Sequence, residues 1–175
     1  YKLKDGGAKT LVTTNFPMML PRALKLLADG HCERVIVGDD ARWGQPPAAL
    51  GAIHESDKIL NFESLLAHEP SVPFPEVSPD DVAVLQYTGG TTGTPKGAML
   101  THANLHINIQ QIAAWAPDLM HGKERVMAAL PFFHVFAMTV VMGLGVKVAA
   151  EMILMPRFVL QDCLDLIAKH RPTIM

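Results

Sequence analysis

The chain has 175 residues, of which 49% are hydrophobic, and a formal net charge of −2. This size and apolar content suit one globular domain with its own core, and we expect a single α/β domain over residues 1–175. The charged residues are scattered and form no basic stripe, so nucleic acid is not an expected partner.

The first part of the chain predicts a strand–helix–strand unit. Residues 9–14 and 34–37 have the pattern of strands, and residues 17–29 have the spacing of a helix. Prolines interrupt residues 38–79, where only residues 62–68 look helical. We expect residues 38–79 to be a long surface excursion.

The central part places a glycine-rich segment between two strands. The strands are predicted at residues 82–87 and 97–100, and Thr101 is a good N-cap for a helix that reaches about Trp115. The apolar face of this helix is predicted to consist of Leu105, Ile109 and Ile112. Its opposite, polar face is predicted to consist of Asn104, Asn108 and Gln111.

The last part alternates strands at 125–130 and 150–155 with helices at 136–146 and 158–170. Such alternation indicates a layered α/β fold whose sheet is largely parallel and flanked by helices. Residues 126–146 lack Asp, Glu, Lys and Arg and are long enough to span a bilayer. A proline near the start of this run and two glycines near its end favour a buried strand and helix instead.

The glycine-rich segment, Tyr87 to Gly97, contains four glycines, four threonines and one lysine. Glycine lets backbone N–H groups approach an anion, threonine adds hydroxyl donors and lysine adds a positive charge. The segment lacks the Gly-Lys-Ser/Thr end of a Walker loop, and it leads into a strand rather than the helix of a dinucleotide fingerprint. A plain hairpin turn would not need four threonines, so we predict a polyphosphate-binding loop.

The same residues carry a family resemblance. Residues 85–97 resemble the AMP-binding signature of the adenylate-forming superfamily, and residues 98–105 resemble the segment that follows it. Residues 130–139 resemble the next motif of that superfamily. Among its members, the chain is most similar to the bacterial long-chain fatty-acid CoA ligases, and it resembles part of their large N-terminal domain.

The resemblance implies roles for particular residues. The phosphates of Mg-ATP would be bound by Thr88, Gly89, Gly90, Thr91, Thr92, Gly93, Thr94 and Lys96, with Lys96 and Thr92 acting in catalysis. His134, Phe132 and Phe133 would line the acyl pocket, although a histidine satisfied within the core is the alternative for His134. No residue is predicted to bind a metal directly, and His102 and His106 lack a third ligand.

The implied activity is ATP-dependent conversion of a long-chain fatty acid to an acyl-adenylate and then to acyl-CoA, with ATP, Mg²⁺ and coenzyme A. The chain starts at Tyr1 without a methionine, so we expect a fragment that lacks the C-terminal lid domain and is inactive alone. The unpaired Cys32 and Cys163 indicate a reducing, cytoplasmic location. Peripheral association with the inner face of the cell membrane and the oligomeric state stay open.

Three alternatives share these features. An acyl-AMP ligase, or an aryl- or amino-acid-adenylating enzyme of the same superfamily, would have the same loop. A nucleotide- or phosphate-binding module would use the loop without catalysis. A membrane-docking segment would be built on residues 126–146.

Overall fold

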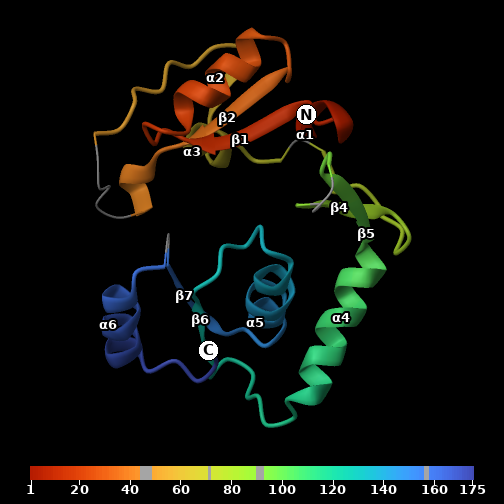
Figure 1. The fold of residues 1–175 in the computed structure, drawn as a ribbon, viewed down its shortest axis with the longest axis vertical. Coiled ribbons are helices and arrows are strands. Elements are labelled where there is room, and N and C mark those ends of the chain that lie inside the picture. Colours follow the sequence, from red (N-terminus) through yellow and green to blue (C-terminus); the bar gives the residue numbers. More distant parts are fainter. Residues whose placement is uncertain (44–48, 71, 90–92, 156–157) are drawn as a thin grey trace. The chain divides into compact units, whose positions relative to one another are not determined.

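The computed structural model describes residues 1–43, 49–70, 72–89, 93–155 and 158–175. The chain divides into two compact units, Tyr1–Glu76 and Val77–Met175, each with its own strands and helices (Figure 1). Within the described ranges, the strands form two parallel sheets and one antiparallel hairpin. The predicted α/β class, with parallel strands flanked by helices, is confirmed, with the strands divided among separate sheets.

The first unit is built on a parallel sheet in the order β1-β2-β3. Its strands are β1 (Thr10–Thr14), β2 (Arg34–Gly38) and β3 (Ile59–Asn61). Its helices are α1 (Lys2–Asp5), α2 (Leu20–Ala28), the 3-10 helix η1 (Asp40–Trp43) and α3 (Phe62–Leu66). Alternate residues of a strand share one face, so Val35 and Val37 of β2 pack together with Leu20 and Ala23 of α2.

The prediction that residues 38–79 form only a surface excursion was wrong. Strand β3 pairs in parallel with Val35–Val37 of β2, and Ile59 packs against the core of the unit. Asn61 then caps α3, because its Oδ1 accepts hydrogen bonds from the backbone N–H groups of Glu63 and Ser64. Three residues are too few to show the alternation by which a strand is recognised.

The second unit contains an antiparallel hairpin and a parallel strand pair. The hairpin is formed by β4 (Val82–Thr88) and β5 (Lys96–Thr101), and the parallel pair by β6 (Arg125–Ala128) and β7 (Glu151–Leu154). The helices are α4 (His102–Trp115), the π-helix η2 (Ala137–Gly143), α5 (Leu144–Lys147) and α6 (Leu160–His170). Thr101 and Asn104 form the predicted start of α4 as a capping box.

The helix predicted at residues 136–146 is present but divided into η2 and α5. A single π-helical stretch within a helix often marks a functional region. The uncharged run 126–146 therefore contains most of strand β6, a connecting loop, η2 and most of α5. In the described ranges, no helix has the length and apolar character needed to cross a membrane.

Strand β6 is buried on both faces. Val126 and Ala128 pack with Ala137 and Val141 of η2, and Met127 packs on the other side among the residues of a second cluster. One edge of β6 pairs with β7. Its other edge meets Ile174, whose carbonyl accepts the N–H of Met127 at 2.9 Å.

Glu124, which is 7% exposed, joins this edge to the preceding loop. Its carboxylate accepts hydrogen bonds from the backbone N–H of Met120 and the hydroxyl of Thr173, and these lower the pKa of Glu124 below its ordinary value. A carboxylate whose pKa is lower in the folded state stabilises that state above its unfolded pKa. This contribution is lost as the pH falls through the folded pKa.

We therefore expect the Glu124→Gln variant to lose less stability than the parent when the pH is lowered. Urea denaturation of parent and variant, measured from neutral pH into the acid range, would show a flatter acid limb for the variant. Asp118→Asn, which changes an exposed carboxylate of the same unit, should keep the parent slope. Identical acid limbs for Glu124→Gln and the parent would contradict this role.

Candidate functional site

The β4–β5 hairpin carries both ends of the glycine-rich loop. Thr88 and Lys96 are the last pair before the loop, and the Thr88 hydroxyl donates to the Lys96 carbonyl at 3.4 Å. Residues directly opposite each other in an antiparallel pair project from the same face, so these two exposed side chains lie side by side. The predicted ligands Gly90, Thr91 and Thr92 lie outside the described residues.

Two glycines of this segment have a structural reason to be glycine. Gly93 has φ +153°, in the region that favours glycine. A Cβ at Gly97 would lie 3.1 Å from Cζ of Tyr87, its partner across the hairpin, so Gly97 makes room for that ring. At Gly89, by contrast, a Cβ would meet nothing within 4 Å in the described structure, and a ligand can approach the backbone there.

A long-range hydrogen bond between described residues connects the hairpin to the second motif. Gln86 Nε2 donates to the Phe133 carbonyl at 3.1 Å, across 47 residues of sequence. Gln86 and Thr88 are two residues apart on β4, so their side chains share a face. The Thr88–Lys96 pair is therefore on the face of the hairpin from which Gln86 reaches Phe133, about 7 Å further along the strand.

A hydrogen bond indicates which ring nitrogen of His134 is the acceptor. Its Nδ1 accepts the backbone N–H of Phe136 at 3.3 Å, so Nδ1 carries the lone pair. In the neutral ring the proton is then on Nε2, which can donate to an oxygen of a ligand. The residue is exposed, which argues against the alternative of a histidine enclosed in the core.

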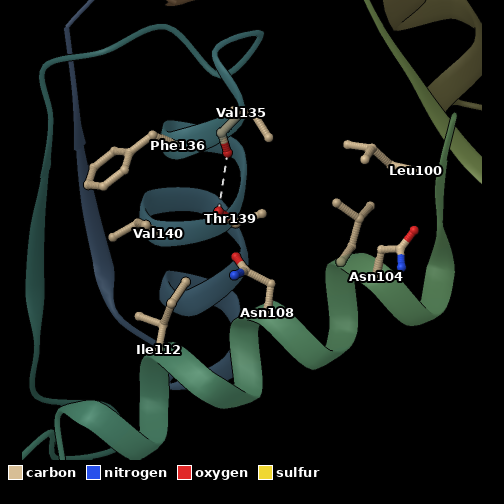
Figure 2. A pocket seen from close by; sticks show the side chains of 9 residues that line it. Leu100, Asn104, Asn108, Ile112, Val135, Phe136, Thr139 and Val140 are labelled. Carbon is tan, nitrogen blue, oxygen red and sulfur yellow. Dashed lines mark hydrogen bonds between the residues drawn. The ribbon is translucent and has the colours of Figure 1, made fainter. Parts of the chain in front are cut away.

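A largely apolar cavity of about 490 Å³ lies between α4 and η2 (Figure 2). The side chains that line it come from β5, from α4 and from the segment that contains η2: Leu100, Asn104, Leu105, Asn108, Ile112, Val135, Phe136, Thr139 and Val140. The Thr139 hydroxyl donates to the Val135 carbonyl at 3.2 Å and so is satisfied within its own helix. The cavity thus offers an apolar lining with few free polar groups.

The structure separates the three predicted pocket residues. Phe132 packs against the core cluster around Val126, whereas Phe133 is 77% exposed and His134 is also exposed. The cavity begins immediately after them, at Val135 and Phe136. The three residues therefore precede the lining residues in sequence but are not part of the lining, which on this segment begins at Val135.

Sequence reasoning missed this lining, although one signal was available. Phe136 and Val140 are four apart on one segment, and Asn104, Asn108 and Ile112 are four apart on the other. Such spacing places side chains on one face of a helix. The predicted opposition of polar and apolar faces on α4 was wrong here, because Asn108 and Ile112 line the same cavity.

Lys96 supplies positive charge to the hairpin face. In the part of the chain that the structure describes, Lys96 has no carboxylate within salt-bridge distance. Over the same residues, no group of three or more His, Cys, Asp or Glu side chains is placed to hold a metal ion. His106 Nε2 lies 3.2 Å from Gln110 Nε2, and the side-chain oxygen Oε1 of Gln110 accepts a hydrogen bond from Lys147 Nζ.

Comparison with known proteins identifies the family. The family model described as "AMP-binding enzyme" matches residues 1–175. A long-chain-fatty-acid–CoA ligase of Bacillus subtilis is 35% identical, and the match covers 99% of this chain and 33% of the relative. A 4-coumarate–CoA ligase of rice is 33% identical, and the match covers 93% of this chain and 32% of the relative. The chain therefore spans about a third of the length of these curated relatives.

A solved structure agrees with these matches. The crystal structure of a long-chain-fatty-acid-CoA ligase from Archaeoglobus fulgidus superposes with a TM-score of 0.73 and 29% identity, over 98% of this chain and 30% of the other. The sequence motifs and the family match over residues 1–175 point to the same family. The chain belongs to the AMP-binding enzyme family, whose members include long-chain fatty-acid CoA ligases.

Proposed function

We propose that this chain is the ATP-phosphate-binding and acyl-binding part of an AMP-forming long-chain fatty-acid CoA ligase. The hydrogen bond from Gln86 to Phe133 is the observation that carries the proposal. It brings the strand that leads into the loop against the segment that leads into the apolar cavity. A nucleotide phosphate and a carboxylate could thus meet on one face of the hairpin.

The loop would bind the β- and γ-phosphates of ATP. The donors would be the hydroxyls of Thr91, Thr92 and Thr94, the backbone of Gly89, Gly90 and Gly93, and the Lys96 ammonium, with the Thr88 hydroxyl joining them when it turns from the Lys96 carbonyl to the phosphate. The described part of this set fits an anion, because Gly89 is open to approach and Lys96 is exposed and free of carboxylate partners. Backbone N–H groups and a lysine are a common combination at phosphate sites.

Mg²⁺ would reach this site with the nucleotide. We assign it no side chain, since the described residues gather no carboxylate cluster for it. When bound, it would neutralise phosphate charge. Lys96 would do the same from the protein side, and the Thr92 hydroxyl would donate a hydrogen bond to the phosphate.

The acyl substrate would lie between the His134 segment and the α4–η2 cavity. His134 Nε2 would donate to a substrate oxygen and the exposed ring of Phe133 would flank it, while Phe132, packed against the cluster around Val126, would support this wall from the core side. The alkyl chain would extend along Phe136 and Val140, in a cavity of a size usual for small-molecule pockets.

The proposed reaction has two steps. A carboxylate oxygen attacks the α-phosphorus of ATP, a new P–O bond forms and the α–β P–O bond breaks, releasing pyrophosphate. The coenzyme A thiolate then attacks the acyl carbon, and AMP leaves with the C–O bonding electrons. Lys96 and the loop amides would stabilise the charge that develops in the first step.

The remaining assignments follow from this activity. Both units would belong to one large AMP-binding domain, and a C-terminal lid domain elsewhere in the protein would complete the active site, so residues 1–175 alone would be inactive. The partners would be a fatty acid, ATP and coenzyme A in the cytoplasm, with peripheral association at the inner face of the cell membrane to reach the fatty acid.

Pyrophosphate release by the full-length protein tests the proposal. We expect release from ATP that depends on a long-chain fatty acid, followed by acyl-CoA formation when coenzyme A is added. ATP binding without release would instead support the phosphate-binding module. Release with 4-coumarate but not with fatty acids would favour an aryl-acid ligase, which the 33% identity to the rice enzyme makes the second candidate.

Transfer to a carrier protein but not to coenzyme A would identify an acyl-AMP ligase. The same assay therefore separates the family members that share the loop.

A further inference from the structure

Gly143 is the last residue of η2 and packs against Ile109 of α4. Of the described glycines in the second unit, it leaves the least room for a Cβ. Its backbone has φ −64° and ψ −49°, which any residue adopts in a helix. Glycine is otherwise disfavoured inside a helix, because it has more conformational freedom to lose than alanine. The reason for glycine here must therefore be space.

The contact distances show how little space there is. A Cβ at Gly143 would lie 2.5 Å from Cδ1 and 2.8 Å from Cγ1 of Ile109, and 3.3 Å from the Met138 carbonyl. Carbon atoms in contact stand about 3.5–4.0 Å apart, so the overlap with Ile109 is about 1 Å. An isoleucine in a helix keeps almost entirely to one χ1 rotamer. Cδ1 can turn away about χ2, but Cγ1 is held by χ1, so relief of the 2.8 Å contact would come from moving α4 away from η2.

The apolar cavity opens directly beside this contact. Ile109 follows Asn108 and precedes Ile112 on α4, and Gly143 follows Thr139 and Val140 on η2. In Figure 2, Asn108 and Ile112 rise from α4 toward the helix that carries Thr139 and Val140. The distance at which the helices meet at Gly143 thus sets how wide the cavity is.

We infer that Gly143 is a specificity-determining residue: by letting Ile109 reach the backbone of η2, it fixes the cavity width and thereby the acyl chain that fits. The inference rests on the proposed function, in which this cavity takes the alkyl chain. Gly143 would act as a positioning residue, through α4, without touching the substrate.

Gly143→Ala in the full-length protein tests this. Pyrophosphate release is measured with straight-chain fatty acids and with branched or ring-bearing acids of equal length. We expect the ratio of kcat/KM for bulky over straight-chain acids to rise about 10-fold, the low end of the effect that one methylene group has on discrimination in an apolar pocket. The KM for ATP should stay at the parent value, which general destabilisation would not predict.

Gly145→Ala is the matched control. It makes the same substitution in the adjoining helix, but the atoms nearest its Cβ would be Cγ and Sδ of the flexible Met152 side chain on β7, at 3.2 Å, and not atoms of α4. We expect the parent acid preference in this variant. Equal shifts in both variants, or a parent profile in Gly143→Ala, would overturn the inference.

Removing the partner atoms gives a second test. The double variant Gly143→Ala/Ile109→Ala lacks Cγ1 and Cδ1 of Ile109 and should move the acid preference back toward the parent. If Gly143→Ala alone does not fold, the double variant still tests the contact between Gly143 and Ile109. A folded double variant would support that contact, and an unfolded double variant would overturn the inference. A parent that releases no pyrophosphate with any acid would overturn the proposed function, and this inference with it.

Discussion

Lys96→Ala is expected to slow fatty-acid-dependent pyrophosphate release by the full-length protein about 100- to 1000-fold, the usual effect of removing one preorganised group that stabilises transition-state charge. Lys96 follows the loop on the exposed face shared with Thr88. A lysine about 4 Å from a phosphate contributes about 4 kcal/mol of gross Coulomb energy at an effective dielectric constant near 20. Steady-state kinetics with varied ATP and fatty acid would measure the change.

Two substitutions serve as controls for Lys96. Lys123→Ala removes an exposed lysine of the same unit and should leave the rate unchanged. Lys96→Arg keeps the charge and should recover part of the activity. The KM for the fatty acid should change little in Lys96→Ala, because Lys96 is assigned to phosphate. A large rise in that KM with an unchanged kcat would show that Lys96 acts on the carboxylate instead.

Leu144→Ala is expected to lower the free energy of unfolding by about 2–5 kcal/mol, the range found when a buried leucine is truncated. Leu144 begins α5 and is 2% exposed, among the largest fully buried side chains of the described structure. Truncation removes apolar contacts and leaves a cavity that the surrounding helices fill only in part. Urea denaturation followed by circular dichroism would measure the loss.

Val146→Ala is the control for Leu144, since Val146 is on the same short helix but is 69% exposed. Its effect should stay within about 0.5 kcal/mol, as for most surface substitutions. Similar losses for the two variants would mean that α5 is held by something other than burial of Leu144.

The elements that were predicted well are those with local causes. The strands on either side of the glycine-rich segment follow from its composition and from their own apolar residues. The start of α4 follows from Thr101, whose side chain accepts the N–H of Asn104 at 3.2 Å while Asn104 bonds back to Thr101. Both partners of that capping box lie within four residues, so the sequence contains the whole interaction.

The features that were missed depend on distant partners. Strand β3 is a strand because β2 lies beside it, more than twenty residues earlier in the chain. The link between Gln86 and Phe133 joins positions that show no local pattern in common. The cavity likewise requires α4 and η2 to lie together, and its narrow side depends on the absence of a Cβ at Gly143. A single sequence does not contain such pairings in a readable form.

The position of Ile174 beside Val126 bears on the order in which the second unit assembles. The two residues are 48 positions apart, and a chain emerges from the ribosome with its N-terminal part first. Strand β6 therefore has one open edge until residue 174 has been synthesised, although β7 can pair with it earlier. Closing so long a loop is slow relative to local folding, so the Met127 amide should be among the last in this strand to gain protection from hydrogen exchange.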